Sequence, residues 1–90
     1  MSVRVVRNGL GRCRFAFSTG RKLGSAVVRN RVRRRLRSVV RSMAPRLDEG
    51  WDVLVVARPP CIEASYQELA ASVERLFRRA GILRNGEGAP

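Results

Sequence analysis

Apolar and polar residues alternate in two short stretches near the start of the chain. Val3 and Val5 alternate with Arg4, and Val6 extends the apolar run, while residues 13–17 place Cys and Phe at every second position. Alternation with a period of two predicts β-strands. The turn sequence at residues 8–11 lies between them, so the two strands are predicted to pair as a hairpin.

Between Ser25 and Met43 the apolar residues recur every three or four positions, which predicts a helix. Ser25 is suited to cap its first turn, the preceding loop covers residues 20–24, and Ala44-Pro45 ends it. At 100° per residue, the apolar positions fall within an arc of roughly 120°. This predicted core-facing stripe consists of Val28, Val32, Leu36, Val39, Val40 and Met43. Arg29 and Arg35 flank the stripe.

The second half of the chain predicts one more strand and one more helix. Residues 51–57 are apolar on both alternating sets, which is typical of an inner strand covered on both faces. Residues 65–68 have the spacing of a capping box, and the helix that follows is expected to end at Gly81. Its predicted buried residues are Leu69, Val73, Leu76, Phe77 and Ala80.

Together these elements predict an α+β fold, a small sandwich with the order strand-strand-helix-strand-helix. Ninety residues make one small domain, which we place at residues 1–84, followed by a flexible C-terminal tail at residues 85–90. The strand-helix-strand unit must cross over, and the general rule for parallel strands favours a right-handed connection.

Charge is distributed unevenly over the chain. The formal net charge is +12, and residues 1–46 hold 14 Lys or Arg and no acid, whereas residues 47–90 hold 5 basic and 7 acidic residues. Ten of the basic residues lie between Arg21 and Arg46. Because no acid interrupts this block, it predicts a helix whose exposed face binds phosphates. Arg outnumbers Lys 18 to 1, and this ratio favours bidentate contacts with phosphates.

No combination of residues predicts catalysis by the protein alone. His is absent, Ser18 and Thr19 have no base beside them, and the acids of residues 48–52 are expected to offset nearby Arg or stay solvated. Cys13 and Cys61 form no metal-binding pair and are expected to be reduced and half-buried. Without a membrane-spanning run or a secretion signal, the chain is predicted to be soluble and cytoplasmic.

The run from Arg14 to Arg37, RFAFSTGRKLGSAVVRNRVRRRLR, closely resembles the signature of the protein subunit of bacterial ribonuclease P. The resemblance continues downstream in the acidic turn Asp48-Glu49, the strand from Val53 to Arg58 and the element Ser65-Tyr66-Gln67-Glu68. The positions that match the signature are Arg14, Ser18, Arg21, Lys22, Gly24, Ala26, Val27, Arg29, Asn30, Arg31, Arg33, Arg34 and Arg37.

This resemblance implies a protein that binds the catalytic RNA of ribonuclease P and helps it remove the 5′ leader from precursor tRNA. It implies that the RNA and its Mg²⁺ ions perform the cleavage, that the protein alone binds no cofactor, and that the crossover is left-handed. No membrane and no obligate protein partner are inferred. The RNA-binding residues that it implies are Arg29, Asn30, Arg31, Arg33, Arg34, Arg37, Arg21 and Lys22, with Arg12 and Arg14 as leader contacts.

The start of the chain departs from the family pattern. Family members usually carry an N-terminal helix before the first strand, which forms one wall of the leader cleft, whereas this chain opens at Met1-Ser2-Val3. We therefore expect the protein to assist cleavage with little dependence on leader length. Thr19-Gly20 also stands where the family has Val-Ser.

Two other classes remain as alternatives. One is another small basic RNA-binding or ribosomal-type protein with no part in tRNA processing, although an RRM would need a second aromatic strand and a glycine between Arg14 and Phe15. The other is an amphipathic helix on acidic membranes, which would show Trp, Phe or Leu on its apolar face. The stripe here is mostly Val, which favours packing within a domain.

Overall fold

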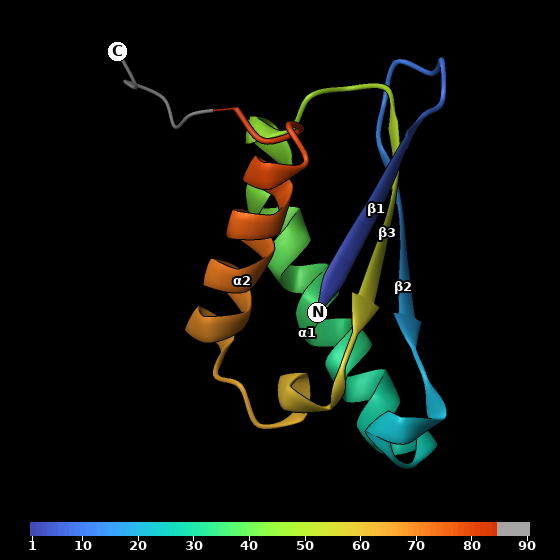
Figure 1. Ribbon diagram of the computed structural model, residues 1–90, viewed down its shortest axis with the longest axis vertical. Coiled ribbons are helices and arrows are strands. Elements are labelled where there is room, and N and C mark those ends of the chain that lie inside the picture. The colour runs from blue at the N-terminus through green and yellow to red at the C-terminus, as the bar shows by residue number, and fades with distance from the viewer. Residues whose placement is uncertain (85–90) are drawn as a thin grey trace.

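The computed structural model describes residues 1–84, which form a three-stranded mixed sheet with two helices against one face (Figure 1). The strands are β1 (Ser2–Arg7), β2 (Arg14–Thr19) and β3 (Trp51–Ala57). Their order across the sheet is β1-β3-β2, with β1 antiparallel and β2 parallel to β3. The predicted α+β class and the element order are confirmed, and the predicted tail at residues 85–90 lies outside the described residues.

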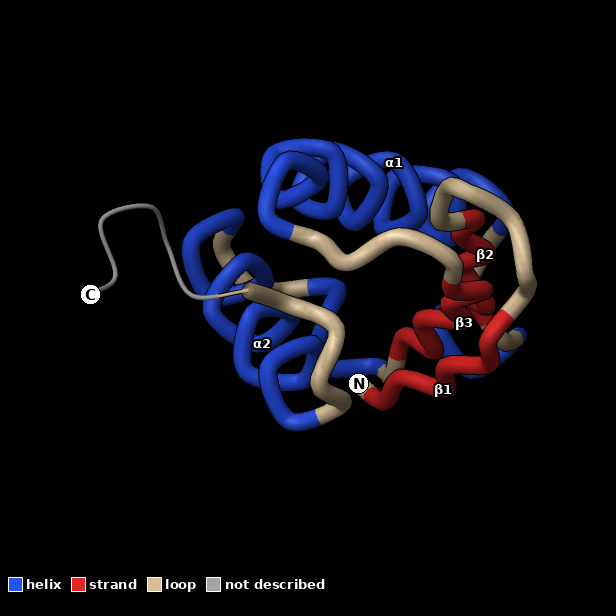
Figure 2. Tube along the Cα trace, turned by 90° about the horizontal axis from the view of Figure 1, so that it is seen from above, coloured by secondary structure: helices blue, strands red, loops and turns tan. Residues whose placement is uncertain are grey.

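The predicted hairpin of the first two strands is wrong, because β3 lies between them (Figure 2). Val53 stands opposite Val5 on one side and Phe15 on the other, so the most apolar strand occupies the centre and contacts both neighbours. The segment after β1 bonds to the turn before β3, since the Asn8 N–H donates to the Gly50 carbonyl at 2.9 Å. The segment between β1 and β2 therefore crosses the end of β3, and its turn-forming residues do not make a hairpin.

The two helices are α1 (Ala26–Met43) and α2 (Tyr66–Arg79), joined to the sheet through short 3₁₀ turns η1 (Arg21–Leu23), η2 (Ala44–Arg46) and η3 (Pro59–Ile62). Both predicted N-caps are confirmed: Ser25 caps α1, and Ser65 forms a capping box with Glu68 on α2. The path from β2 through α1 to β3 turns in the left-handed sense (Figures 1 and 2), as the family resemblance implied.

The core lies between the helices and one face of the sheet. The predicted stripe of α1 is buried except for Val28, which is half-buried, and α2 buries Leu69, Val73 and Phe77 while Leu76 and Ala80 stay half-buried. Four core residues that the patterns did not indicate come from the connecting and terminal segments. They are Leu23, Leu47, Ile82 and Leu83.

The expectation that β3 is covered on both faces is wrong for the described residues. Val53, Val55 and Ala57 are buried, but Leu54 and Val56 on the opposite face are only partly covered. The reason is that both helices pack on the same side of the sheet (Figure 2). No helix within residues 1–84 is both long and apolar enough to cross a membrane.

Candidate nucleic-acid interface

The N-terminal end of α1 concentrates positive potential. Ser25 Oγ accepts a hydrogen bond from the Val28 N–H at 3.3 Å, and the first turn contains no acidic residue. The end of a helix where N–H groups point outward carries a partial positive charge. Gly24 has φ +113°, which a residue with a side chain rarely adopts, and it allows η1 to hold the exposed Arg21 and Lys22 beside this end.

The exposed side of α1 carries most of the basic residues that the sequence predicted to bind RNA. We call it the α1 surface. Five of its basic side chains and one amide are exposed, namely Arg31, Arg34, Arg37, Arg21, Lys22 and Asn30. Every ion pair in the described part of the chain uses other basic residues. The cationic groups of the α1 surface therefore remain available to an anionic partner.

Two predicted RNA-binding residues also make contacts within the protein. Arg33 is half-buried, and its guanidinium donates to Asn30 Oδ1 at 2.8 Å and to Thr19 Oγ1 at 2.6 Å. It therefore fastens the end of β2 to α1. Arg29 is also half-buried, and its Nη1 approaches the Gly24 carbonyl at 3.5 Å.

A second basic region lies on the opposite side of the molecule, on the sheet face that the helices leave open. A shallow hollow of about 430 Å³ occupies this face. Its outward-facing lining residues define the open sheet face, and they are Arg4, Val6, Arg14, Ala16, Asp52 and Leu54. Val6 has 65% of its surface exposed, which is unusual for a strand residue of its kind. Arg4 was missed at the sequence level, although its alternation with Val3 and Val5 was the available signal.

Arg14, one of the two predicted leader contacts, lies on the open sheet face as one half of an ion pair. Its Nε and Nη2 donate to the two carboxylate oxygens of Asp52 at 2.7 Å and 2.6 Å, and Asn8 Nδ2 donates to the same carboxylate at 2.9 Å. The hydrogen bonds from Arg14 and then Asn8 lower the pKa of Asp52 to about 2. The carboxylate is thus charged at neutral pH and offsets part of the positive potential of this face.

The other predicted leader contact, Arg12, is exposed in the connection between β1 and β2, and its carbonyl accepts a bond from Asn8 Nδ2 at 3.1 Å. Arg14 lies on the open sheet face, on the side of the sheet away from the helices, so the structure does not bring it together with the α1 surface. Arg12 instead lines a hollow with Asp48, Glu49 and Ala44, the residue after the last residue of α1.

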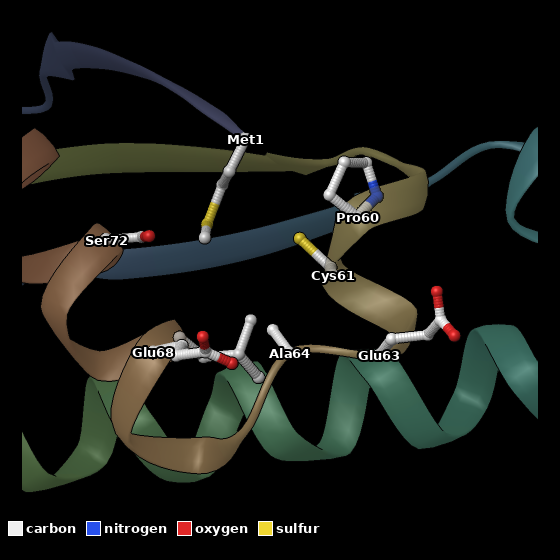
Figure 3. Close-up of a pocket in the computed structure, with 8 residues that line it drawn as sticks. Met1, Pro60, Cys61, Glu63, Ala64, Glu68 and Ser72 are labelled. Carbon is white, nitrogen blue, oxygen red and sulfur yellow. The ribbon is translucent and has the colours of Figure 1, made fainter.

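A hollow of about 370 Å³ near the start of β1 has a different character (Figure 3). Glu63 and Glu68 line it together with Met1 and Cys61, and no basic residue does. Its chemistry is therefore unsuited to phosphates. Among residues 1–84, no three side chains of the types that hold metals lie together, and both Cys residues are free thiols, Cys13 half-buried as expected and Cys61 fully buried.

Comparison with known proteins identifies relatives over most of the chain. The sequence model of the family described as Ribonuclease P matches residues 1–81. A ribonuclease P protein component from Symbiobacterium thermophilum is 49% identical over 71 residues, which are 79% of this chain and 62% of that protein. One from Roseiflexus castenholzii is 43% identical over 79 residues, 87% of this chain and 63% of that protein. The chain thus spans less than two thirds of the length of these curated relatives.

Solved structures show the same fold. The ribonuclease P protein from Staphylococcus aureus superposes with a TM-score of 0.80 at 25% identity, covering 91% of this chain and 75% of that one. The protein from Thermotoga maritima gives a TM-score of 0.78 at 26% identity, covering 86% of this chain and 76% of that one. These likenesses do not favour the alternative of an unrelated ribosomal-type protein.

Proposed function

Since this chain belongs to the ribonuclease P protein family, we propose that it binds the catalytic RNA of ribonuclease P and assists removal of the 5′ leader from precursor tRNA. The protein contributes binding and charge neutralisation, while the RNA and its Mg²⁺ ions perform the cleavage. As a consequence, the protein acts in the cytoplasm, where tRNA precursors are processed.

The observation that carries this proposal is the α1 surface. Its exposed Arg31, Arg34 and Arg37 are free of acidic partners within the described residues, and they extend from a helix N-terminus flanked by Arg21 and Lys22. Guanidinium groups in such an array neutralise RNA phosphates and release their counterions. The α1 surface is therefore assigned to the catalytic RNA.

The open sheet face is assigned to the leader of precursor tRNA. Its hollow combines apolar side chains such as Val6 and Leu54 with the basic residues Arg4 and Arg14, which suits a single strand with exposed bases and a charged backbone. The ion pair of Arg14 with Asp52 moderates the charge of this face. Contact with the leader is thus expected to be weaker than contact through the α1 surface.

The test is cleavage of a precursor tRNA by a bacterial ribonuclease P RNA at low Mg²⁺ concentration, with and without the protein. We expect the protein to increase the rate, because phosphate repulsion between the two RNAs is least screened when Mg²⁺ is scarce. The protein without RNA is expected to cleave nothing. A rate that the protein leaves unchanged across the Mg²⁺ range would contradict the proposal.

A further inference from the structure

A hollow of about 290 Å³ lies in the seam between β2 and α1, next to the α1 surface. We call it the seam hollow, and its lining residues are Phe15, Phe17, Arg37, Val40, Arg41 and Ala44. We propose that the seam hollow binds one unpaired nucleobase of the RNA partner, with the flanking phosphates on Arg37 and Arg41. This inference rests on the proposed function and adds a base-binding site to a surface otherwise assigned to phosphates.

The floor of the seam hollow is apolar and held in place by the core. Val40 is buried, and Phe15 and Phe17 are half-buried, so each ring keeps a part open to the hollow. The Phe15 ring stacks with the buried Phe77 ring of α2, with centroids 6.4 Å apart and planes 25° apart. Rings fixed in this way offer a base a surface for stacking without an ordering cost on binding.

The rim of the seam hollow is cationic. The Arg37 guanidinium lies 5.8 Å from the centroid of the Phe17 ring, at the outer limit of a cation-π contact. Arg37 and Arg41 are exposed, and no carboxylate within residues 1–84 forms an ion pair with either. Two unpaired guanidinium groups above an aromatic floor match one nucleotide, which has an apolar ring face and an anionic backbone.

The surroundings of the seam hollow limit the direction of a bound strand. An adjoining hollow shares Phe15 and Ala44 and has mixed charge, because Arg12 lines it together with Asp48 and Glu49. The charged residues that line the seam hollow, Arg37 and Arg41, are both basic. The RNA backbone is therefore expected to leave the seam hollow toward the α1 surface. A volume of 290 Å³ lies just below the 300–1,000 Å³ of pockets for drug-sized molecules, which fits a single ring system.

The test fills the seam hollow without changing any charge. Ala44→Leu extends an apolar side chain from the residue that caps the C-terminus of α1. Ala71→Leu makes the same change at an exposed position of α2 that lines none of the hollows described above. Affinity of each full-length variant for a bacterial ribonuclease P RNA is measured over a range of salt concentrations. Thermal melting checks that each variant folds. If Ala44→Leu does not fold, Phe17→Leu, which removes the Phe17 ring from the seam hollow, is measured in its place.

We expect Ala44→Leu to weaken RNA binding between about fivefold and 150-fold, the range for losing one base stacked on an aromatic side chain. The salt dependence should not change, because every guanidinium is kept. Ala71→Leu should bind as the wild type does. Chemical probing of the RNA at saturating protein should show a nucleotide protected by the wild type and by Ala71→Leu but not by Ala44→Leu.

A further arm identifies the base itself. Replacing the protected nucleotide by an abasic one should weaken wild-type binding, and Ala44→Leu should then cost nothing more, since both changes remove the same contact. Equal affinity of the wild type and Ala44→Leu for the unmodified RNA would overturn the inference while leaving the proposed function intact. Failure of the wild type to bind the RNA at all would overturn the proposed function, and this inference with it.

Discussion

Basic residues that look equivalent in the sequence have different roles in the folded protein. Arg33 donates hydrogen bonds to Asn30 and Thr19, and Arg14 forms a two-point contact with Asp52, whereas Arg31 and Arg34 are exposed without an acidic partner in the described residues. The number of Arg residues could predict that this helix is strongly cationic. It could not predict which guanidinium groups are held within the protein, because Thr19 and Asp52, which bind Arg33 and Arg14, lie on strands distant in sequence.

The ion pair of Arg14 and Asp52 makes stability depend on pH in the acidic range. The folded-state pKa of Asp52 is lowered from 3.8 to about 2, so its contribution is fully present above the unfolded value and is lost as pH falls from about 4 toward 2. We expect Asp52→Asn to unfold more easily than the wild type at pH 5 and to approach it at pH 2. Urea unfolding of both proteins at the two pH values measures the difference. Glu49→Gln is the control, and an equally large difference at both pH values would contradict this prediction.

Leu36 is a large, fully buried residue of the α1 stripe, so truncating its side chain should lower the free energy of unfolding. Its side chain has 0% of its surface exposed, and replacing such a leucine by alanine leaves a cavity that costs about 2–5 kcal/mol. We expect Leu36→Ala to lower the unfolding free energy by that amount in urea, a large part of the stability of a small domain. Ser38→Ala, at an exposed position of the same helix, should change it little. A loss below 1 kcal/mol for Leu36→Ala would mean that the core relaxes around the cavity.

At the scale of elements, the helices were predictable and the strand pairing was not. A period of 3.6 and a capping serine are local signals, and both placed α1 and α2 nearly at their observed bounds. Pairing depends on which strands bury the most apolar surface together, and here β3, some 30 residues after β2, enters between β1 and β2. The turn sequence after Arg7 therefore predicted a hairpin of β1 and β2, which does not form because both strands pair with β3.

The α1 surface should govern both the affinity for RNA and its salt dependence. Replacing Arg31 and Arg34 by Ala removes two exposed charges without removing any contact within the described residues, so the domain should stay folded. Each lost phosphate contact should reduce the slope of log affinity against log salt by about 0.7–0.9. Filter binding to a bacterial ribonuclease P RNA at several salt concentrations measures the slope.

The matched control for this double variant is Arg75→Ala with Arg79→Ala, which removes two exposed charges from α2. Both double variants lower the net charge equally, so a general loss of charge should affect them alike. Equal slopes for the two would show that binding follows net charge rather than the α1 surface. Arg33→Ala is distinct from both, because it also breaks the bonds to Asn30 and Thr19 and should lower the melting temperature.

At the scale of the whole molecule, the division of charge along the sequence does not become a division in space. The acidic half of the chain supplies β3, which lies between β1 and β2 of the basic half, and Asp52 thereby reaches Arg14 on the open sheet face. The α1 surface is not mixed in this way, because none of its basic residues forms an ion pair with an acid of residues 1–84. The charge pattern could therefore locate the strongest cationic surface. The expectation that the acids of residues 48–52 offset nearby Arg is confirmed for Asp52, which pairs with Arg14.

The concentration of positive charge on α1 predicts that anions stabilise the fold. Repulsion among like charges disfavours the compact state of a protein with a net charge of +12. An anion that binds only the folded protein relieves this repulsion and adds about 2.7 kcal/mol when its concentration is 100 times its dissociation constant. Sulfate should thus raise the melting temperature more than chloride at matched ionic strength, by about 4–8 °C for each kcal/mol.

Sulfate also strengthens apolar burial in any protein, and this general effect should be the same in the variant with Arg31→Ala and Arg34→Ala. The part of the sulfate-induced rise in melting temperature that the variant loses measures anion binding at the α1 surface. An equal rise in both proteins would mean that sulfate acts only through the solvent.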